Sequence, residues 1–163
     1  MPSKGGIHRI SSKSTRRPIN ARSETAPTMP MFRDAFARRH CLVPADAFYE
    51  WTEVDGVKQP WAIARADGAP LTFAGLWEGW RGTAGDVVRS FTILTTTANV
   101  ALSPLHERMP VVLEQADWPL WLGEVAGDTA TLLRPSRADF TTWRVSSAVN
   151  SVRNDGATLL EPA

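Results

Sequence analysis

The sequence has little of the residue types that most often carry catalysis or bind metals. It holds one cysteine, Cys41, and three histidines among 163 residues. A single thiol excludes an internal disulfide framework, and so few Cys and His side chains are too few for a zinc site of the Cys/His type. No Gly-rich phosphate loop and no dinucleotide-binding fingerprint occurs. We therefore expect neither a metal nor a cofactor.

Long apolar runs are missing as well. No segment approaches the roughly 18 consecutive apolar residues of a membrane-spanning helix. The basic start at residues 1–6 has no apolar stretch behind it, so it does not resemble a secretory signal. An unpaired cysteine fits a reducing compartment better than an oxidising one. These absences predict a cytoplasmic protein without membrane contact, and a monomer is the simplest expectation.

The near-neutral net charge of +1 conceals a strong asymmetry along the chain. Residues 1–40 carry nine Lys or Arg and two acidic residues, a net charge of +7, whereas the remaining residues carry −6. Such a distribution is typical of a basic segment that meets a polyanion, or of a solvated arm. We interpret residues 1–18 as a basic, weakly ordered arm.

The rest of the chain predicts one β-rich domain. Apolar pairs at helical spacing indicate a helix over residues 30–40, and residues 114–122 predict a second short helix. Asp-Gly pairs at 55–56 and 67–68 indicate hairpin turns. The β-prone segments are residues 41–44, 47–51, 60–64, 71–77, 90–97, 110–113 and 142–146.

The expected fold class is thus α+β. Residues 19–163 would form a single domain with a mixed or antiparallel, barrel-like sheet and flanking short helices. Neither an internal repeat nor a second domain is evident in the sequence.

Three short polar segments interrupt this apolar, Trp-rich chain, at residues 20–24, 48–51 and 106–110. His106 can act as an acid or a base near neutral pH, and it lies on an expected loop, where reactive side chains concentrate. Glu50 stands among Phe48, Tyr49 and Trp51, where a carboxylate is costly to bury unless it is paired. Alternation puts Glu50 with Phe48 on one face and Trp51 on the other.

Each of these residues also has a purely structural interpretation. His106 could hydrogen-bond its loop, and residues 20–24 could form a turn through Asn20 and Ser23. Arg22 and Arg108 could each bind a phosphate with two hydrogen bonds, or form a surface ion pair.

A hydrolase that uses Cys41 as nucleophile and His106 as base is another alternative. However, Cys41 begins an apolar strand, and free cysteine is among the most buried residue types. A buried structural role is therefore favoured for this thiol.

Taken together, the polar segments resemble a known family. The chain is similar to the SOS response-associated peptidase (SRAP) family of abasic site processing proteins, from about Ile19 to Pro162. The blocks that carry the resemblance are INARSET at 19–25, RHCLVPADAFYEW at 39–51, FAGLWE at 73–78, ILTT at 93–96, HERMP at 106–110 and VNSVRND at 149–155.

The resemblance implies a fold, a substrate and a set of residues. Family members recognise abasic sites in single-stranded DNA and cross-link to them through an N-terminal cysteine, which closes a thiazolidine ring on the sugar aldehyde. Carried over, Asn20, Glu50 and His106 would be the catalytic residues around that cysteine. Arg22 and Arg108 would hold the flanking phosphates. The family name also implies a peptidase or hydrolase, or lyase-type chemistry, in the DNA damage response.

The sequence departs from the family at its start. The family opens with Met-Cys-Gly-Arg, whereas this sequence begins Met1-Pro2 and has nineteen residues before Asn20. We therefore expect the chain to lack the family's N-terminal segment and its nucleophile. Three interpretations remain: a shortened form of an active cross-linker, a paralogue that binds single-stranded DNA without covalent chemistry, or a protein whose Pro2 amine forms an imine.

Overall fold

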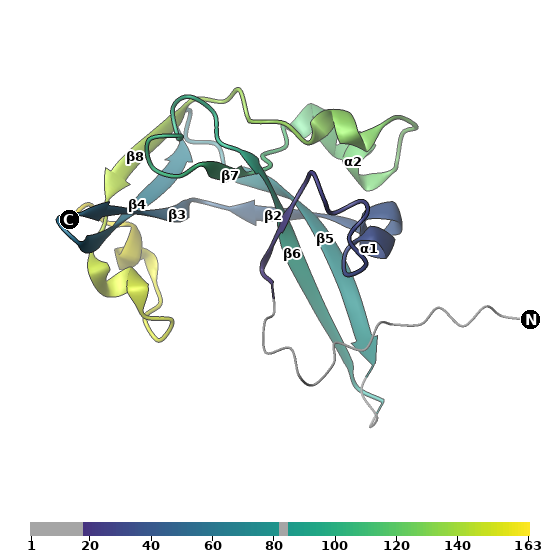
Figure 1. Ribbon diagram of the computed structural model, residues 1–163, viewed down its shortest axis with the longest axis horizontal. Helices are drawn as coiled ribbons and strands as arrows, with labels where there is room; N and C mark the ends of the chain where they lie inside the picture. Colours follow the sequence, from purple (N-terminus) through teal and green to yellow (C-terminus); the bar gives the residue numbers. More distant parts are fainter. Residues whose placement is uncertain (1–17, 82–84) are drawn as a thin grey trace, which may run out of the picture.

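The structure is a computed structural model that describes residues 18–81 and 85–163. These residues form two β-sheets with short helices at the ends of the molecule (Figure 1). The basic arm expected at residues 1–18 falls outside the described residues except for Pro18.

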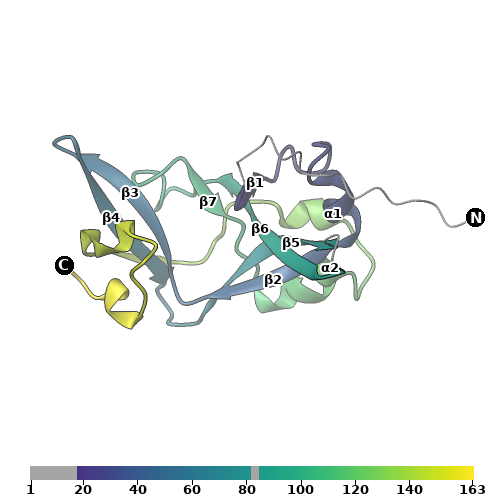
Figure 2. The ribbon, with the colours of Figure 1, turned by 90° about the horizontal axis from the view of Figure 1, so that it is seen from below.

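The larger sheet has the strand order β1-β6-β5-β2, and β7 pairs with β6 as well. Its strands are β1 (Asn20–Arg22), β2 (His40–Ala45), β5 (Leu71–Arg81), β6 (Val87–Thr97) and β7 (Arg108–Pro110). β1 runs parallel to β6, and the other pairs are antiparallel. Figure 2 shows β1 beside β6, and β6 separates β1 from β5.

The smaller sheet has the order β3-β4-β8 and is antiparallel throughout. It comprises β3 (Phe48–Val54), β4 (Val57–Arg65) and β8 (Phe140–Arg144). The β3–β4 hairpin turns at Asp55 and Gly56, which have φ angles of 51° and 77°. Two consecutive positive φ angles are the geometry that favours Asp-Gly in a two-residue hairpin loop.

Helices are few and short. α1 (Arg33–Arg38) packs near β2 and β5, and α2 (Trp118–Leu122) packs on β2. The other helical segments are the 3₁₀ turns η1 (Gln115–Asp117), η2 (Thr129–Leu132), η3 (Ser147–Asn150) and η4 (Ala157–Leu160). No helix among residues 18–81 and 85–163 is long and apolar enough to cross a membrane.

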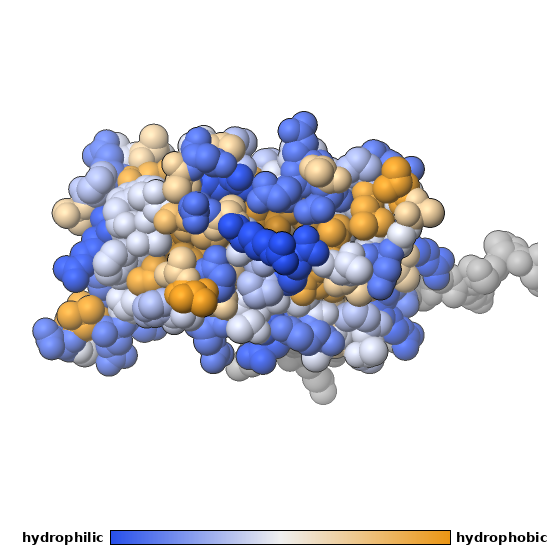
Figure 3. Space-filling view, turned by 90° about the horizontal axis from the view of Figure 1, so that it is seen from above, coloured by the Kyte–Doolittle hydropathy of each residue, from blue (hydrophilic) through white to orange (hydrophobic). Residues whose placement is uncertain are grey.

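Two hydrophobic clusters lie on opposite faces of the larger sheet. One contains Leu76, Leu94 and Trp121 and receives the helices. The other contains Ile63 and Phe73 and joins the larger sheet to the smaller one. The upper face of the molecule, by contrast, is a mosaic of small apolar patches separated by polar side chains (Figure 3).

The α+β, β-rich class expected from the sequence is confirmed, with one mixed and one antiparallel sheet, neither of them closed into a barrel. Residues 20–22, for which we considered a turn, form β1, because β6 offers them a parallel edge. β2 continues through Pro44, since a proline is tolerated on an edge strand. The helix expected at 114–122 divides into η1 and α2.

Candidate functional site

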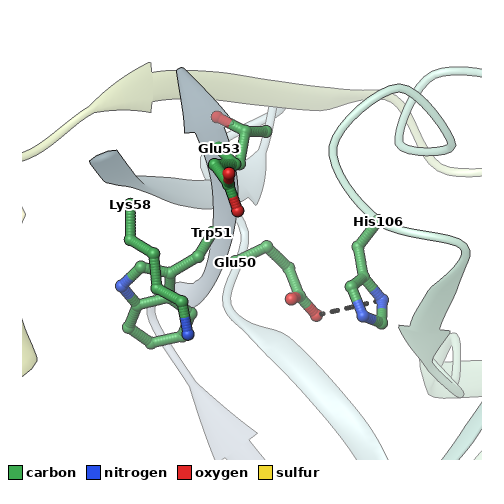
Figure 4. A pocket seen from close by; sticks show the side chains of 6 residues that line it. Glu50, Trp51, Glu53, Lys58 and His106 are labelled. Carbon is green, nitrogen blue, oxygen red and sulfur yellow. Dashed lines mark ion pairs between the residues drawn. The ribbon is translucent and has the colours of Figure 1, made fainter. Parts of the chain in front are cut away.

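Glu50 and His106 face one another across the junction of the two sheets. Glu50 is on β3 of the smaller sheet, and His106 lies just before β7 of the larger one. The distance from His106 Nδ1 to Glu50 Oε1 is 3.9 Å (Figure 4). The Glu50 side chain is 22% exposed and that of His106 is 44% exposed. The two groups therefore interact electrostatically at a site that solvent still reaches.

The backbone of Arg108 orients the imidazole of His106. The Arg108 N–H lies 3.0 Å from His106 Nδ1 and donates to it when that nitrogen is unprotonated. In the protonated ring, Nδ1–H can instead donate to the Arg108 carbonyl, 3.1 Å away. The loop thus accommodates both charge states of His106. A proton-transfer residue needs such tolerance.

Partial burial changes the acidity of Glu50. Desolvation raises the pKa of its carboxyl above the ordinary value, and the charge of His106 acts in the opposite direction. A carboxyl with a raised pKa next to an imidazole is a typical arrangement for proton transfer. Burial on the Phe48 side of β3 is the physical cause, because Phe48 packs into the cluster between the sheets.

Arg108 forms the second link between the polar segments. Its guanidinium donates to both carboxylate oxygens of Glu24, at 2.8 and 2.9 Å, and to the carbonyl of Thr95 at 2.6 Å. The Arg108 side chain is 15% exposed. The same contact lowers the pKa of Glu24, chiefly through the hydrogen bonds from Arg108. This ion pair ties the turn after β1 to β7, next to His106.

Asn20 and Arg22 are placed by β1. Both side chains are exposed, and their register partners on β6 are Ile93 and Thr95. Among the described residues, neither side chain has a hydrogen-bond or ion-pair partner. The structure therefore joins Glu50 to His106 and Glu24 to Arg108. Asn20 and Arg22 are exposed on β1, which pairs with β6 in the larger sheet.

An open hollow of about 290 Å³ adjoins Glu50 and His106 along β3. Trp51 and Lys58 also line it. Alternation points Trp51 away from Glu50, but the hollow follows the edge of β3, so it reaches side chains on both faces of the strand. The Trp51 indole N–H donates to Asn150 Oδ1 at 2.7 Å. Sequence patterns did not identify Trp51, Lys58 or Glu24 as site residues. For Glu24 the only available signal was its place in the block at residues 20–24.

Cys41 does not resemble a nucleophile. It lies on β2 opposite Gly75, and a Cβ at Gly75 would stand 2.8 Å from the Cys41 Sγ. Desolvation raises the pKa of this thiol, which disfavours the reactive thiolate. Because His106 faces Glu50, the geometry does not favour the Cys41–His106 hydrolase. In the part of the chain that the structure describes, no three His, Cys, Asp or Glu side chains group as metal ligands.

Fold and site together define a β-rich domain with a solvent-accessible carboxylate–imidazole pair between two open sheets. Residues 6–152 match the SOS response associated peptidase (SRAP) family. The chain belongs to this family.

Named relatives and solved structures agree with that assignment. The chain is 38% identical to the abasic site processing protein YoqW of Bacillus subtilis, over 88% of this chain and 66% of the relative. It is 39% identical to YoaM, also an abasic site processing protein of Bacillus subtilis, over 88% and 65%. A crystal structure of a Bacteroides thetaiotaomicron protein superimposes with a TM-score of 0.78 at 27% identity, over 88% of this chain and 65% of that one. The chain thus spans about two thirds of these relatives.

Proposed function

We propose that this chain acts in abasic-site processing, by binding single-stranded DNA at an abasic site and supplying the acid–base groups that act on the sugar. The observation that carries the proposal is the Glu50–His106 pair, in a chain whose curated relatives are named abasic site processing proteins. Asn20 is the proposed third catalytic residue, since it is exposed and in register with Ile93, which packs against the same cluster between the sheets as Phe48.

The proposed chemistry is attack of an amine on the aldehyde of the open-chain abasic sugar. As the imine forms, the amine loses a proton and the former aldehyde oxygen leaves as water. Glu50 accepts the amine proton and passes it to the former aldehyde oxygen, and His106 donates the second proton with which that oxygen leaves as water. Asn20 can orient the amine by hydrogen bonding. By the family resemblance the attacking amine is that of an N-terminal cysteine, whose thiol then closes the ring.

Arg22 and Arg108 are the proposed phosphate contacts, with unequal roles. Arg22 is exposed, so it can approach a phosphate directly. Arg108 already bonds Glu24 and Thr95, so its larger contribution is to position the loop that carries His106. We expect Arg22→Gln to reduce the salt dependence of DNA binding by a slope of about 0.7 per lost contact.

Borohydride trapping of the imine on abasic single-stranded DNA tests the proposal. With the Pro2 amine as the candidate attacking group of this chain, we expect an adduct that requires the abasic site. The trapping rate should be at least about 100-fold lower in Glu50→Gln and His106→Gln. The matched control is Glu53→Gln, which removes another carboxylate from the same strand and the same hollow.

Three outcomes separate the alternatives. Equal trapping on intact and abasic DNA, or an equal loss in Glu53→Gln, would contradict the proposal. Abasic-dependent binding without any adduct would support the binding module instead. Loss of a reductant-dependent adduct in Pro2→Met would identify the Pro2 amine as the attacking group.

A further inference from the structure

The outer half of the β5–β6 hairpin carries an unusual surface. This long two-stranded ribbon extends away from the junction of the sheets (Figure 1). Trp77 on β5 and Phe91 on β6 are register partners, so they lie on the same face, and they are 40% and 58% exposed. Two large aromatic side chains at this exposure are a feature that monomeric proteins usually avoid or use for binding.

The Trp77 ring lies along the strand. A Cβ placed at Gly79 would meet Trp77 Cζ3 at 3.9 Å, so the indole leans over the position where Gly79 has no side chain. Gly79 is in register with Arg89, which is exposed on that same face. Because Gly79 has no side chain, the Trp77 indole has room beside Arg89, and an aromatic group and a cationic group are neighbours there.

Charge on this face has one sign. Arg81 and Arg89 project on the side of Trp77 and Phe91, because all four share the alternation of the paired strands. Glu78 is the only acidic residue within β5 and β6, and it lies on the opposite face, paired with Arg39 at 2.6 Å. Asp86 stands at the tip, just before β6. We call the four residues Trp77, Arg81, Arg89 and Phe91 the Trp77–Phe91 face.

This face continues directly into the candidate site. Ile93 follows Phe91 on the same face of β6, about 7 Å along the strand, and Asn20 is in register with Ile93. Ala21, the next residue of β1, packs on the opposite side of the sheet with Leu94. Asn20 and the Trp77–Phe91 face therefore share one side of the sheet.

We infer that the Trp77–Phe91 face is a binding surface for the single strand that flanks the abasic site, with bases stacked on Trp77 and Phe91 and phosphates near Arg81 and Arg89. Aromatic side chains beside cationic ones are what unpaired nucleotides recognise, because every base has a π-face and the backbone is anionic. The inference rests on the proposed function and adds to it a route for the strand beyond Asn20.

Fluorescence anisotropy with two labelled oligonucleotides tests the inference. Each oligonucleotide carries one tetrahydrofuran abasic analogue. The long one has about 20 nucleotides, and the short one has about 4, so that it occupies the candidate site alone. We expect Trp77→Leu and Phe91→Leu each to weaken binding of the long oligonucleotide about tenfold, and to leave the short one unchanged. Leucine keeps an apolar side chain but removes the stacking surface.

Trp80→Leu is the matched control. Trp80 is exposed on the same hairpin but faces the other side of the sheet, so its replacement should not alter binding of either oligonucleotide. Wild-type affinity of Trp77→Leu and Phe91→Leu for the long oligonucleotide would overturn the inference. A wild-type dimer in sedimentation that dissociates in Trp77→Asp but persists in the leucine variants would assign the face to a second copy, and would overturn it as well.

Failure of the proposed function would give a different result. In that case the short abasic oligonucleotide would bind no better than a short intact one, whatever residue stands at position 77. Failure of the inference alone would preserve this preference for the abasic analogue and remove only the effect of Trp77→Leu and Phe91→Leu on the long oligonucleotide.

Discussion

Strands β5 and β3, one from each sheet, are buried to very different extents. All six residues from Leu71 to Leu76 of β5 are buried, because the larger sheet has a hydrophobic cluster on each face. No residue of β3 in the smaller sheet is fully buried. The site takes His106 from the sheet that contains β5 and Glu50 from β3 itself. Its geometry therefore depends on how the two sheets pack together.

Phe48 shows how that packing reaches the site. It precedes Glu50 by two residues on β3, so both side chains point to the same face. Its ring meets Phe73 of β5 edge to face, with centroids 5.8 Å apart. The contact that joins the sheets thus also sets where the Glu50 carboxylate stands relative to His106.

The largest effect is expected on truncation of a buried apolar side chain. Leu94→Ala, at a position with 0% exposure in the larger sheet, should lower the free energy of unfolding by about 2–5 kcal/mol. Val57→Ala, at a position 68% exposed in the smaller sheet, should change it by less than about 0.5 kcal/mol. Urea unfolding measures both, and equal losses would contradict the comparison.

A smaller loss is expected when the larger sheet is overpacked. In Gly75→Ala the new Cβ would meet Cys41 Sγ and Val43 Cγ2, each at 2.8 Å, so the strands must shift. We expect a destabilisation of about 1–3 kcal/mol in thermal or urea unfolding. Adding Cys41→Ala removes one of the two clashes and should recover part of the lost free energy of unfolding. No recovery in the double variant would mean that Val43 or the backbone decides the cost.

Arg65 on β4 links the smaller sheet to Glu114, and its loss should cost about 1–2 kcal/mol. Its guanidinium bonds Glu114 at 2.9 Å and Asp67 at 2.7 Å. Hydrogen bonding from Arg65 lowers the pKa of Asp67 to about 2. The stabilisation from this pairing is present above the unfolded-state pKa and is lost as pH falls toward 2.

Arg65→Met should therefore destabilise the protein near neutral pH and reduce its loss of stability between pH 4 and pH 2. Urea unfolding across this range measures the effect. The control is Arg33→Met, because Arg33 pairs with Asp34 through two side chains that are both exposed. An unchanged loss of stability between pH 4 and pH 2 in Arg65→Met would show that the Arg65–Asp67 pair does not cause it.

The smallest effect on stability is expected at Glu50, and its pH dependence has the opposite sign to that of Asp67. Burial raises its pKa, so the folded state holds the proton more tightly than the unfolded chain does. Stability then falls as pH rises from the unfolded-state pKa through the folded one. Glu50→Gln should be slightly more stable than the wild type at pH 7, with a flatter profile from about pH 4.5 upward. A less stable Glu50→Gln at pH 7 would show that the attraction to His106 outweighs desolvation.

Local signals in the sequence predicted most strands but not all partners. The Asp55-Gly56 turn and the β-branched run at 90–97 were confirmed, because a hairpin turn and a strand preference are encoded within a few residues. β1 was missed, since three residues such as Asn20–Arg22 become a strand only when β6 lies beside them. Family resemblance, rather than periodicity, indicated Asn20 as part of the site.

The sequence alone determined the α+β, β-rich class, because it follows from short-range preferences, and specific blocks of residues grouped the three polar segments as one candidate site. Only the tertiary structure decided which groups meet. Glu50 pairs with His106 across 56 positions of sequence, and Arg108 pairs with Glu24 across 84. Such pairings depend on the register of strands and the packing of two sheets, which no local pattern encodes.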